Sequence, residues 1–355
     1  MTKPAIRNSH LLVVGGAGFV GSNLVHQLLA HDPASLTIVD NFLSSDAVNV
    51  PIHPCVRLVP ASITSDRVLA ALPANLDYAW HLACYHGNQS SIADPLADHE
   101  NNTLTSLKLF ERLKDIKGLK KAVYAAAGCA VAEKTFGDPT ATSEDAPISL
   151  YHDSPYSISK LIGEFYANYY FTRHSLPVVK ARFQNVYGPR EILGAGHWRG
   201  TPHTVWRNVT PTFIFRSLAG EALPLDNGGV ASRDFIFVED MARGLIACAL
   251  EGAPGEVYNL ASGHETSILD LAHMINTMTG NKTPLDLRPA RDWDRSGKRF
   301  GDPAKARDKL GFVAATALET GIERTIAWTR DNLPTIKRCM GQHRALLPGI
   351  GKYLD

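Results

Sequence analysis

Short apolar runs alternate with longer amphipathic stretches over the first 180 residues. The apolar runs predict strands over 10–14, 36–40, 56–60, 77–83, 121–127 and 176–182. Runs that are apolar throughout are typical of strands buried on both faces, and the stretches between them have helical spacing. Strands that alternate with helices form parallel sheets through right-handed crossovers. The pattern therefore predicts a doubly wound α/β domain with a parallel sheet.

The pattern changes after about residue 183. A stretch rich in Gly, His, Trp and Arg occupies 188–208, and a second alternating block follows at 233–240. We therefore expect a smaller α/β domain that is interleaved with the first. The expected division gives 1–184 with 234–260 to the first domain, 185–233 with 261–330 to the second, and 331–355 to a tail without a predicted role.

The charge balance narrows the possible partners. With 36 Lys and Arg against 35 Asp and Glu, the 355-residue chain has a net charge of +1. A chain without a global field lacks an electrostatic basis for binding nucleic acid or an anionic membrane. We expect neither as a partner.

The cysteines and the apolar stretches bear on the location of the protein. Five cysteines are scattered without paired spacing, which argues against a disulfide framework and a structural zinc site. Residues 1–10 are polar, and no apolar stretch reaches the roughly 18 residues of a membrane span. We expect a cytoplasmic protein with no signal peptide, no membrane span and no metal.

A glycine-rich turn follows the first predicted strand. Glycines at 15, 18 and 21 lead into an amphipathic helix, and the run also contains GxGxxG from Gly16. Such a turn lets the backbone approach a pyrophosphate at a helix N-terminus. Asp40 ends the next strand, where a carboxylate accepts ribose hydroxyls, and no Arg follows it to hold a 2′-phosphate. This favours NAD over NADP, although Asp40 could instead be a simple turn residue.

A tyrosine and a lysine lie four residues apart at the start of a later predicted helix. Ser154 and Pro155 suit its N-cap and first turn, and Tyr156 and Lys160 then share a face. A lysine ammonium stabilises a nearby phenolate, so the tyrosine can act as a base. The alternative is an ordinary surface helix.

Together these motifs resemble the extended short-chain dehydrogenase/reductase family, in particular its NAD-dependent nucleotide-sugar epimerases and dehydratases. The likeness covers about residues 10–330. Further matching segments are HLAC at 81–84, SIADP at 91–95, Asn102, RFQNVYGPR at 182–190, SRDF at 232–235 and RDWD at 291–294. The resemblance implies that the first domain is an NAD-binding Rossmann domain and that the second binds substrate.

The resemblance also implies which residues form the cofactor site. The expected NAD-binding residues are Gly15, Gly18, Phe19, Val20, Gly21, Asp40, Asn41, Ser62, Ile63, Leu82, Ala83, Cys84, Asn102, Ala125, Tyr156 and Lys160. Relatives often pair through two helices that correspond to about 94–117 and 154–174, so a homodimer is expected.

The substrate that the resemblance implies is a nucleotide-diphosphate sugar. The expected substrate-binding residues are His86, Ala127, Asn185, Arg199, Asn208, Arg233, Arg291 and Asp294. Within this set, Asn185, Asn208, Arg233 and Arg291 match positions that hold the diphosphate or nucleoside, and Asp294 matches one that meets the ribose. A planar guanidinium suits phosphate oxygens. The alternatives are an ion pair of Arg233 with Asp234 or Glu239, an exposed Arg291, and a surface His86.

The activity implied is oxidation at C4 of the sugar. Tyr156 would remove the 4-hydroxyl proton while C4 passes a hydride to NAD, which gives a 4-keto sugar. The catalytic residues expected are Tyr156, Lys160 and Cys129.

The chain departs from the family after its fifth predicted strand. Ala127 stands where a Ser or Thr hydroxyl usually contacts the sugar oxygen, and Gly128 and Cys129 replace the Asp and Glu of the 4,6-dehydratases. A Cys at this position is similar to the acid/base of GDP-mannose 3,5-epimerases, whose partner lysine corresponds to Arg199. A small buried side chain is the alternative role for Cys129.

Three functions remain open. The leading hypothesis is an NAD-dependent nucleotide-sugar 4-epimerase. The second is a 4-keto-dependent 3,5-epimerase, dehydratase or decarboxylase that uses Cys129. The third is an NAD-binding regulatory protein without catalysis.

Overall fold

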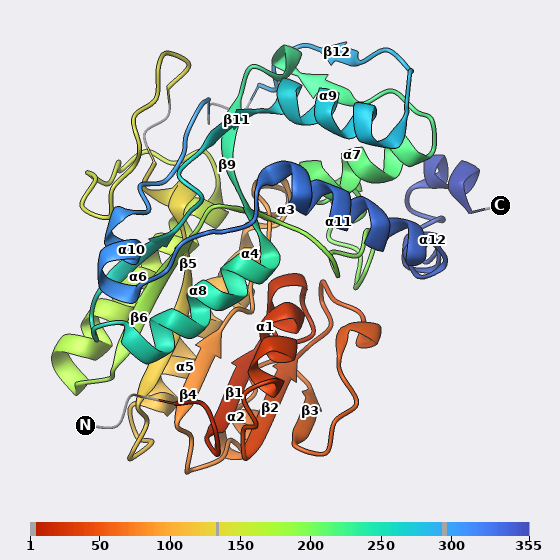
Figure 1. The fold of residues 1–355 in the computed structure, drawn as a ribbon. Coiled ribbons are helices and arrows are strands. Elements are labelled where there is room, and N and C mark those ends of the chain that lie inside the picture. The colour runs from red at the N-terminus through yellow and green to blue at the C-terminus, as the bar shows by residue number, and fades with distance from the viewer. Residues whose placement is uncertain (1–4, 133–134, 293–296, 355) are drawn as a thin grey trace.

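The computed structural model describes residues 5–132, 135–292 and 297–354. Its larger unit is built on a seven-stranded sheet in the order β10-β6-β5-β4-β1-β2-β3, with every neighbouring pair parallel (Figure 1). The strands are β1 (His10–Val14), β2 (Ser35–Asp40), β3 (Val56–Pro60), β4 (Tyr78–His81), β5 (Lys121–Ala127), β6 (Val178–Phe183) and β10 (Val257–Leu260). The doubly wound parallel sheet predicted from the apolar runs is confirmed.

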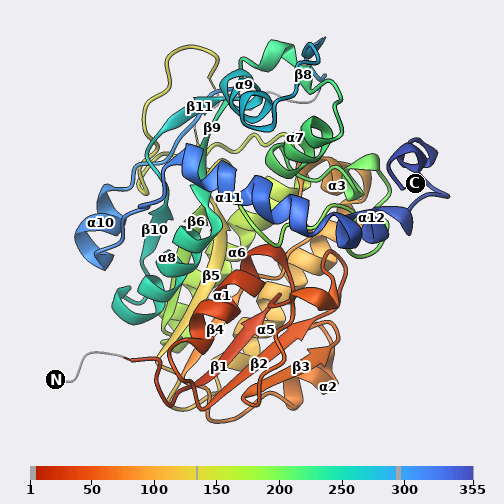
Figure 2. The same ribbon diagram turned by 45° about the vertical axis from the view of Figure 1, so that its right-hand side comes forward.

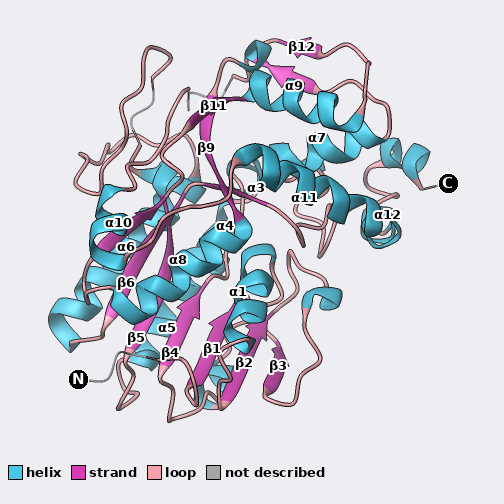
Figure 3. Ribbon diagram, in the orientation of Figure 1, coloured by secondary structure: helices cyan, strands magenta, loops and turns pink. Residues whose placement is uncertain are grey.

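Helices cover both faces of this sheet (Figure 3). Residues alternate between the faces along β1: Leu11 and Val13 belong to one apolar core, and Leu12 and Val14 to the other. The first core is closed by α1 (Phe19–Leu29) and α8 (Val238–Glu251), and the second by α2 (Asp66–Ala70), α5 (Thr105–Leu113) and α6 (Pro155–His174). Burial on both faces explains why these strands are apolar throughout.

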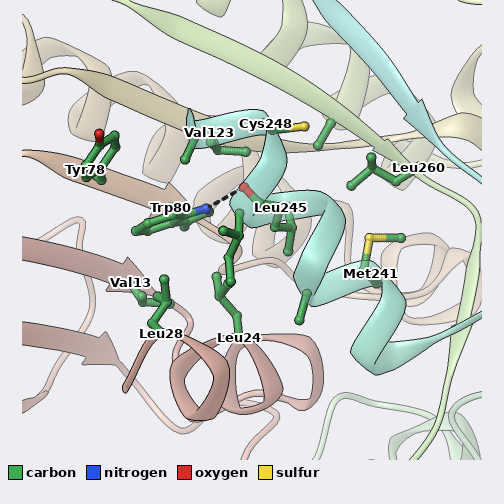
Figure 4. Close-up of a cluster of buried hydrophobic side chains, with 14 of the residues drawn as sticks. Val13, Leu24, Leu28, Tyr78, Trp80, Val123, Met241, Leu245, Cys248 and Leu260 are labelled. Carbon is green, nitrogen blue, oxygen red and sulfur yellow. Dashed lines mark hydrogen bonds between the residues drawn. The ribbon is translucent and has the colours of Figure 1, made fainter. Parts of the chain in front are cut away.

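A tryptophan anchors the core beneath α1 and α8 (Figure 4). Trp80 of β4 is fully buried, and its indole Nε1 donates a hydrogen bond of 3.1 Å to the carbonyl of Leu245. Leu24 and Leu28 of α1 belong to the same cluster. The hydrogen bond satisfies the one polar atom of a large apolar side chain, so the ring adds its full buried area to the core.

The smaller unit contains two further sheets, shown at the top of Figure 1. One sheet has the order β11-β9-β7 and the other pairs β12 with β8. The strands are β7 (Asn185–Tyr187), β8 (Pro224–Asp226), β9 (Ser232–Phe237), β11 (Glu265–Ser267) and β12 (Asp286–Arg288), and the helices α7 (Val209–Leu218), α9 (Ile268–Thr279) and α11 (Leu318–Asp331). In the first of these sheets β9 lies between β7 and β11. After β9 the chain returns to the larger unit with α8 and β10.

The remaining helices lie at the margins of the two units. They are α3 (Asn88–Ala93), α4 (Pro95–Asp98), α10 (Ala304–Leu310) and α12 (Leu333–Gly341). A π-helical turn, His99–Leu104, joins α4 to α5. None of the helices in the described part of the chain has the length and apolar character needed to cross a membrane. All five cysteines are free thiols.

The tail after residue 331 packs against the 191–207 segment. Ile336, Cys339 and Met340 are buried in one apolar cluster with Ile192 and Leu193. Figures 1 and 2 both place α12 beyond the end of α11, close to the C-terminus. The tail, for which the sequence predicted no role, therefore supports the segment between β7 and α7.

Candidate active site

A cleft of about 410 Å³ lies between the two units. Its walls include residues that follow β1, β2, β4 and β5 and residues of the smaller unit. The sheet order reverses between β1 and β4, and ligands of doubly wound sheets bind at such a reversal, beyond the carboxyl ends of the strands.

The glycine turn forms one wall of the cleft. Gly15 has a φ of +86°, and a Cβ there would lie 2.5 Å from the backbone N of Ala83. A Cβ on Gly21 would overlap the carbonyl oxygen of Gly15. Only glycine permits the turn and the close approach of α1, whose N-terminal N–H groups then face the cleft. The cradle fits a pyrophosphate.

Asp40 lies at the end of β2, on the same wall. Its carboxylate accepts hydrogen bonds from the backbone N–H groups of Ala17 and Phe42, both at 2.9 Å, and from Ser45 Oγ at 2.8 Å. Burial raises its pKa, and these donors partly offset the rise. These donors fix the carboxylate at the edge of the cleft, which it lines.

Most of the expected NAD-binding residues line this cleft. They are Gly15, Gly18, Phe19, Val20, Gly21, Asp40, Asn41, Ser62, Ile63, Leu82, Ala83, Cys84, Ala125, Tyr156 and Lys160. The expected strand over 77–83 ends at His81. The N–H groups of Leu82 and Ala83 then both donate to the carbonyl of Val14, which turns the chain along the cleft.

Asn102 is the one expected cofactor residue that the structure places behind the wall of the cleft. It is buried and does not line the cleft. Its Oδ1 accepts from Tyr85 N at 2.7 Å, and its Nδ2 donates to Asp98 at 2.7 Å and to Ser159 Oγ at 3.2 Å. Asn102 therefore fastens the loop after β4 to α6, which positions cofactor-facing neighbours without touching the cleft.

Tyr156 and Lys160 lie on the cleft-facing side of α6. Ser154 caps this helix by accepting from Ser157 N, as the sequence predicted. Lys160 is buried, its Nζ donates 2.9 Å to the carbonyl of Ala125, and it lies 5.8 Å from the centre of the Tyr156 ring. Burial raises the pKa of Tyr156, and the neighbouring Cys84 and Cys129 thiols add to the rise. A positive nicotinamide ring would act with Lys160 in the opposite direction.

The residues after β5 give the catalytic end of the cleft an unusual composition. Ala127 and Cys129 both line it, with Cys129 partly exposed. A Cβ on Gly128 would overlap the side-chain amide of Gln184. Gln184 therefore occupies the space that an acidic side chain at position 128 would need.

His86 stands beside the tyrosine and is partly exposed to the cleft. Its ring meets the Tyr156 ring edge-on, with centroids 5.8 Å apart. Burial, with the Arg199 and Arg207 charges, lowers the pKa of His86 to about 3. His86 is therefore a neutral imidazole beside Tyr156 in the cleft.

Seven of the expected substrate residues line the cleft: His86, Ala127, Asn185, Arg199, Asn208, Arg233 and Arg291. The guanidinium of Arg233 donates 2.6 Å bonds to the carbonyls of Ser232 and Gly297, and Arg291 is ion-paired with Asp226. Asp294 lies outside the described residues.

The cleft also contains polar residues that were not assigned from the sequence. Among them are Gln184, Glu191, His203, Arg207 and Arg299. Glu191 and Arg207 lie at the two ends of the segment between β7 and α7, which the sequence marked only as rich in Trp, His and Arg. Both residues reach the cleft through the fold of the whole segment, which packs against the tail, so no local pattern predicts them.

A doubly wound sheet with a glycine turn and a Tyr–Lys pair defines the class of short-chain dehydrogenases/reductases. A family model described as the NAD dependent epimerase/dehydratase family matches residues 11–261. The chain belongs to this family, which confirms the expectation of an NAD-dependent enzyme acting on nucleotide sugars. The hypothesis of a non-catalytic binding protein is therefore dropped.

Individual relatives span nearly the whole chain. A UDP-glucose 4-epimerase of Mycolicibacterium smegmatis is 31% identical over 90% of this chain and 98% of its own. A dTDP-glucose 4,6-dehydratase of Streptomyces antibioticus is 30% identical over 91% and 93%. A similar solved structure is that of the Bordetella bronchiseptica enzyme WbmF in complex with NAD+ and UDP. Its sequence is 59% identical to this chain, and the two structures superpose with a TM-score of 0.87. The match covers 97% of this chain and 99% of that one.

Proposed function

We propose that the protein is a nucleotide-sugar 4-epimerase that works by transient oxidation at C4. The observation that carries this proposal is the position of Tyr156 and Lys160. They lie in one cleft with the glycine turn on one side and with Arg233 and Arg291 on the other. A sugar whose diphosphate meets those arginines has its ring beside the phenol and the cofactor.

The residues of the chain supply binding and proton transfer. Bound NAD+ supplies the acceptor for the C4 hydride and returns that hydride later. Tyr156 takes the 4-hydroxyl proton as a base, with Lys160 favouring the phenolate. After the ring of the 4-keto sugar turns over, Tyr156 returns the proton and the configuration at C4 is inverted. Ala127 has no hydroxyl to share this proton, so the transfer at O4 is assigned to Tyr156.

The geometry disfavours 4,6-dehydration. That reaction needs an acid for the departing 6-hydroxyl and a base at C5. Position 128 is a glycine whose free space is filled by Gln184, and position 129 is a cysteine. A carboxylate at either position is absent.

Cys129 supports a second candidate, epimerisation at C3 or C5. A ketone at C4 acidifies the neighbouring C–H bonds, and a thiol can exchange protons with them. Cys129 lines the cleft close enough to Tyr156 to affect the pKa of the phenol.

Incubation with nucleotide sugars in deuterated water separates the two candidates. UDP-sugars are the first to test, because the 59% identical WbmF was crystallised with UDP. A C4-inverted product without ring deuterium supports 4-epimerisation. Deuterium at C3 or C5 that disappears in a Cys129→Ala variant supports the second candidate. Absence of turnover with every UDP-, GDP-, dTDP- and CDP-sugar contradicts both.

We also propose that two copies of the chain pair through α4 and α6. Large apolar side chains are exposed on these helices, with Leu96 82%, Phe165 55% and Tyr169 52% exposed. Ile92 of α3 and Ile158 of α6 are exposed as well. Apolar side chains grouped on neighbouring helices are typical of an interface.

A further inference from the structure

Two arginines from the segment between β7 and α7 are held inside the cleft with donor atoms to spare. Arg199 is 4% exposed, and its Nη1 donates 2.8 Å to the carbonyl of His86. Arg207 donates from Nε to the carbonyl of Thr204 at 3.1 Å and from Nη1 to that of Ser44. Backbone carbonyls thus fix both guanidinium groups without neutralising them.

One buried donor atom of each arginine has no partner among the described residues. Arg199 Nε and Arg207 Nη2 are shielded from solvent and make no hydrogen bond. A buried donor without a partner destabilises the folded protein, and more so when the donor is charged. Such atoms indicate that a ligand completes the site.

The charge around the pair is unbalanced. Among the described residues of the cleft, the carboxylates are Asp40 and Glu191. Asp40 is engaged with the turn after β2, and burial raises the pKa of Glu191 to about 7, so its charge is partial near neutral pH. Burial and Arg199 lower the pKa of Arg207 to about 9. An additional anion would relieve the repulsion between the two guanidinium groups.

The position of Arg199 indicates which part of the substrate carries that anion. Arg199 binds the backbone of His86, and the His86 ring contacts the Tyr156 ring. Under the proposed function Tyr156 meets the sugar at O4, so a group next to His86 faces the sugar ring. The diphosphate has its own cations in Arg233 and Arg291.

We propose that Arg199 and Arg207 select a nucleotide sugar whose hexose carries a carboxylate, as in a nucleotide hexuronate. This inference rests on the proposed function for the placement of the sugar. The C6 carboxylate of a hexuronate is attached to C5, the neighbour of C4. A guanidinium binds a carboxylate through paired charge-assisted hydrogen bonds, which a 6-hydroxymethyl group cannot reproduce.

UDP-glucuronate and UDP-glucose test the proposal directly, because they differ only at C6. Dissociation constants are measured by calorimetry on the NAD-loaded protein, with UDP alone as the reference. We expect the wild-type protein to bind UDP-glucuronate at least about tenfold more tightly, because hydrogen bonds between charged groups are stronger than those to a neutral hydroxyl. Equal affinities overturn the proposal whatever any variant does.

Variants locate the source of the preference. Arg199→Gln and Arg207→Gln should each reduce the ratio of the two affinities toward one while the affinity for UDP stays unchanged. Arg330→Gln, an exposed charge on α11 away from the cleft, is the matched control and should keep the ratio. An equal loss for UDP would assign the arginines to the diphosphate, and a loss of NAD affinity would assign them to the cofactor. Either result contradicts the proposal.

Failure of the inference is distinguishable from failure of the proposed function. Turnover of UDP-glucose without preference for the acidic sugar overturns the inference alone. Preferential binding of UDP-glucuronate without epimerisation of any sugar overturns the proposed function and leaves the anion site in place.

Discussion

At the scale of single residues, the site differs from an ordinary dehydratase through a few neighbours of Tyr156. Ala127 has a methyl group and no hydroxyl, and the Gln184 amide lies where a side chain at position 128 would begin. Asn102 acts one step away, since it holds the loop after β4 against α6. Positions 127 to 129 therefore supply neither a hydroxyl nor a carboxylate to the cleft.

Gly128→Ala tests the close packing against Gln184. The added methyl meets the far end of the flexible Gln184 side chain, which must shift, so we expect a loss of about 1 kcal/mol in the free energy of unfolding. The double variant with Gln184→Ala should lose less than the sum of the two single variants, because the overlap is gone. Chemical denaturation of all three proteins measures this, and strictly additive losses would contradict the packing.

Glu191 makes stability depend on pH. Burial raises its pKa from 4.5 to about 7. Between these values the folded chain keeps a proton that the unfolded chain has released, so the stabilisation is full below pH 4.5 and is lost as pH rises through 7. Glu191→Gln mimics the protonated form. Its stability relative to wild type should rise between pH 5 and pH 8, by on the order of 3 kcal/mol.

Denaturation curves at both pH values provide the measurement. His81 and His86, whose pKa values burial lowers to about 3, are present in both proteins, so their effect cancels. Glu319→Gln removes an exposed carboxyl on α11 and serves as the control. A difference between wild type and Glu191→Gln that does not change with pH would show that the carboxyl is ionised throughout.

At the scale of elements, the 191–207 segment is held from two sides. Its His197 N–H donates 3.0 Å to the carbonyl of Leu43, next to the cofactor turn. From the tail, Gln342 Nε2 donates to the carbonyls of Gly194 at 2.7 Å and Gly196 at 2.9 Å. The tail therefore contributes to the shape of the sugar end of the cleft without lining it.

Gln342→Ala should loosen this segment. Each lost hydrogen bond contributes about 1 kcal/mol, so we expect KM for the nucleotide sugar to rise several-fold, with a smaller change in the affinity for NAD. Steady-state kinetics and NAD titration measure the two effects. Leu346→Ala, at an exposed position of the same tail, should leave both unchanged. An unchanged KM in Gln342→Ala would separate the tail from the substrate site.

The sequence predicted the elements whose burial is uniform and missed those that depend on distant partners. The strands of the large sheet stand out because both faces are covered, and the glycine turn because its constraints are local. The strands β7, β8, β11 and β12 have three residues each. Three residues are too few to show the alternation of apolar and polar positions that predicts a strand. The support of 191–207 by the tail joins segments more than 130 residues apart, and no local pattern records it.

At the scale of the whole molecule, the large sheet carries the glycine turn on one side of the cleft. The smaller unit contributes arginines to the same cleft. The chain as a whole is nearly neutral, with a net charge of +1, while several arginines gather in the cleft. This distribution suits a small anionic ligand. The exposed apolar side chains of α4 and α6 lie on the outside of the large unit and belong to the proposed pairing of two chains.

Phe165→Glu tests that pairing. A charge at the centre of an apolar interface should convert the dimer to a monomer in light scattering at micromolar concentration, because an unpaired charge is costly to bury. Val313→Glu, at a similarly exposed position outside α4 and α6, should leave the mass unchanged. A wild-type protein that is monomeric at these concentrations would contradict the proposal.

Transfer of hydrogen at C4 is the central claim, and a UDP-sugar deuterated at C4 tests it most directly. The account predicts that the deuterium slows turnover, remains on C4 of the epimerised product, and that Tyr156→Phe abolishes the reaction. Loss of the label to solvent, or epimerisation that proceeds unchanged in Tyr156→Phe, would contradict it.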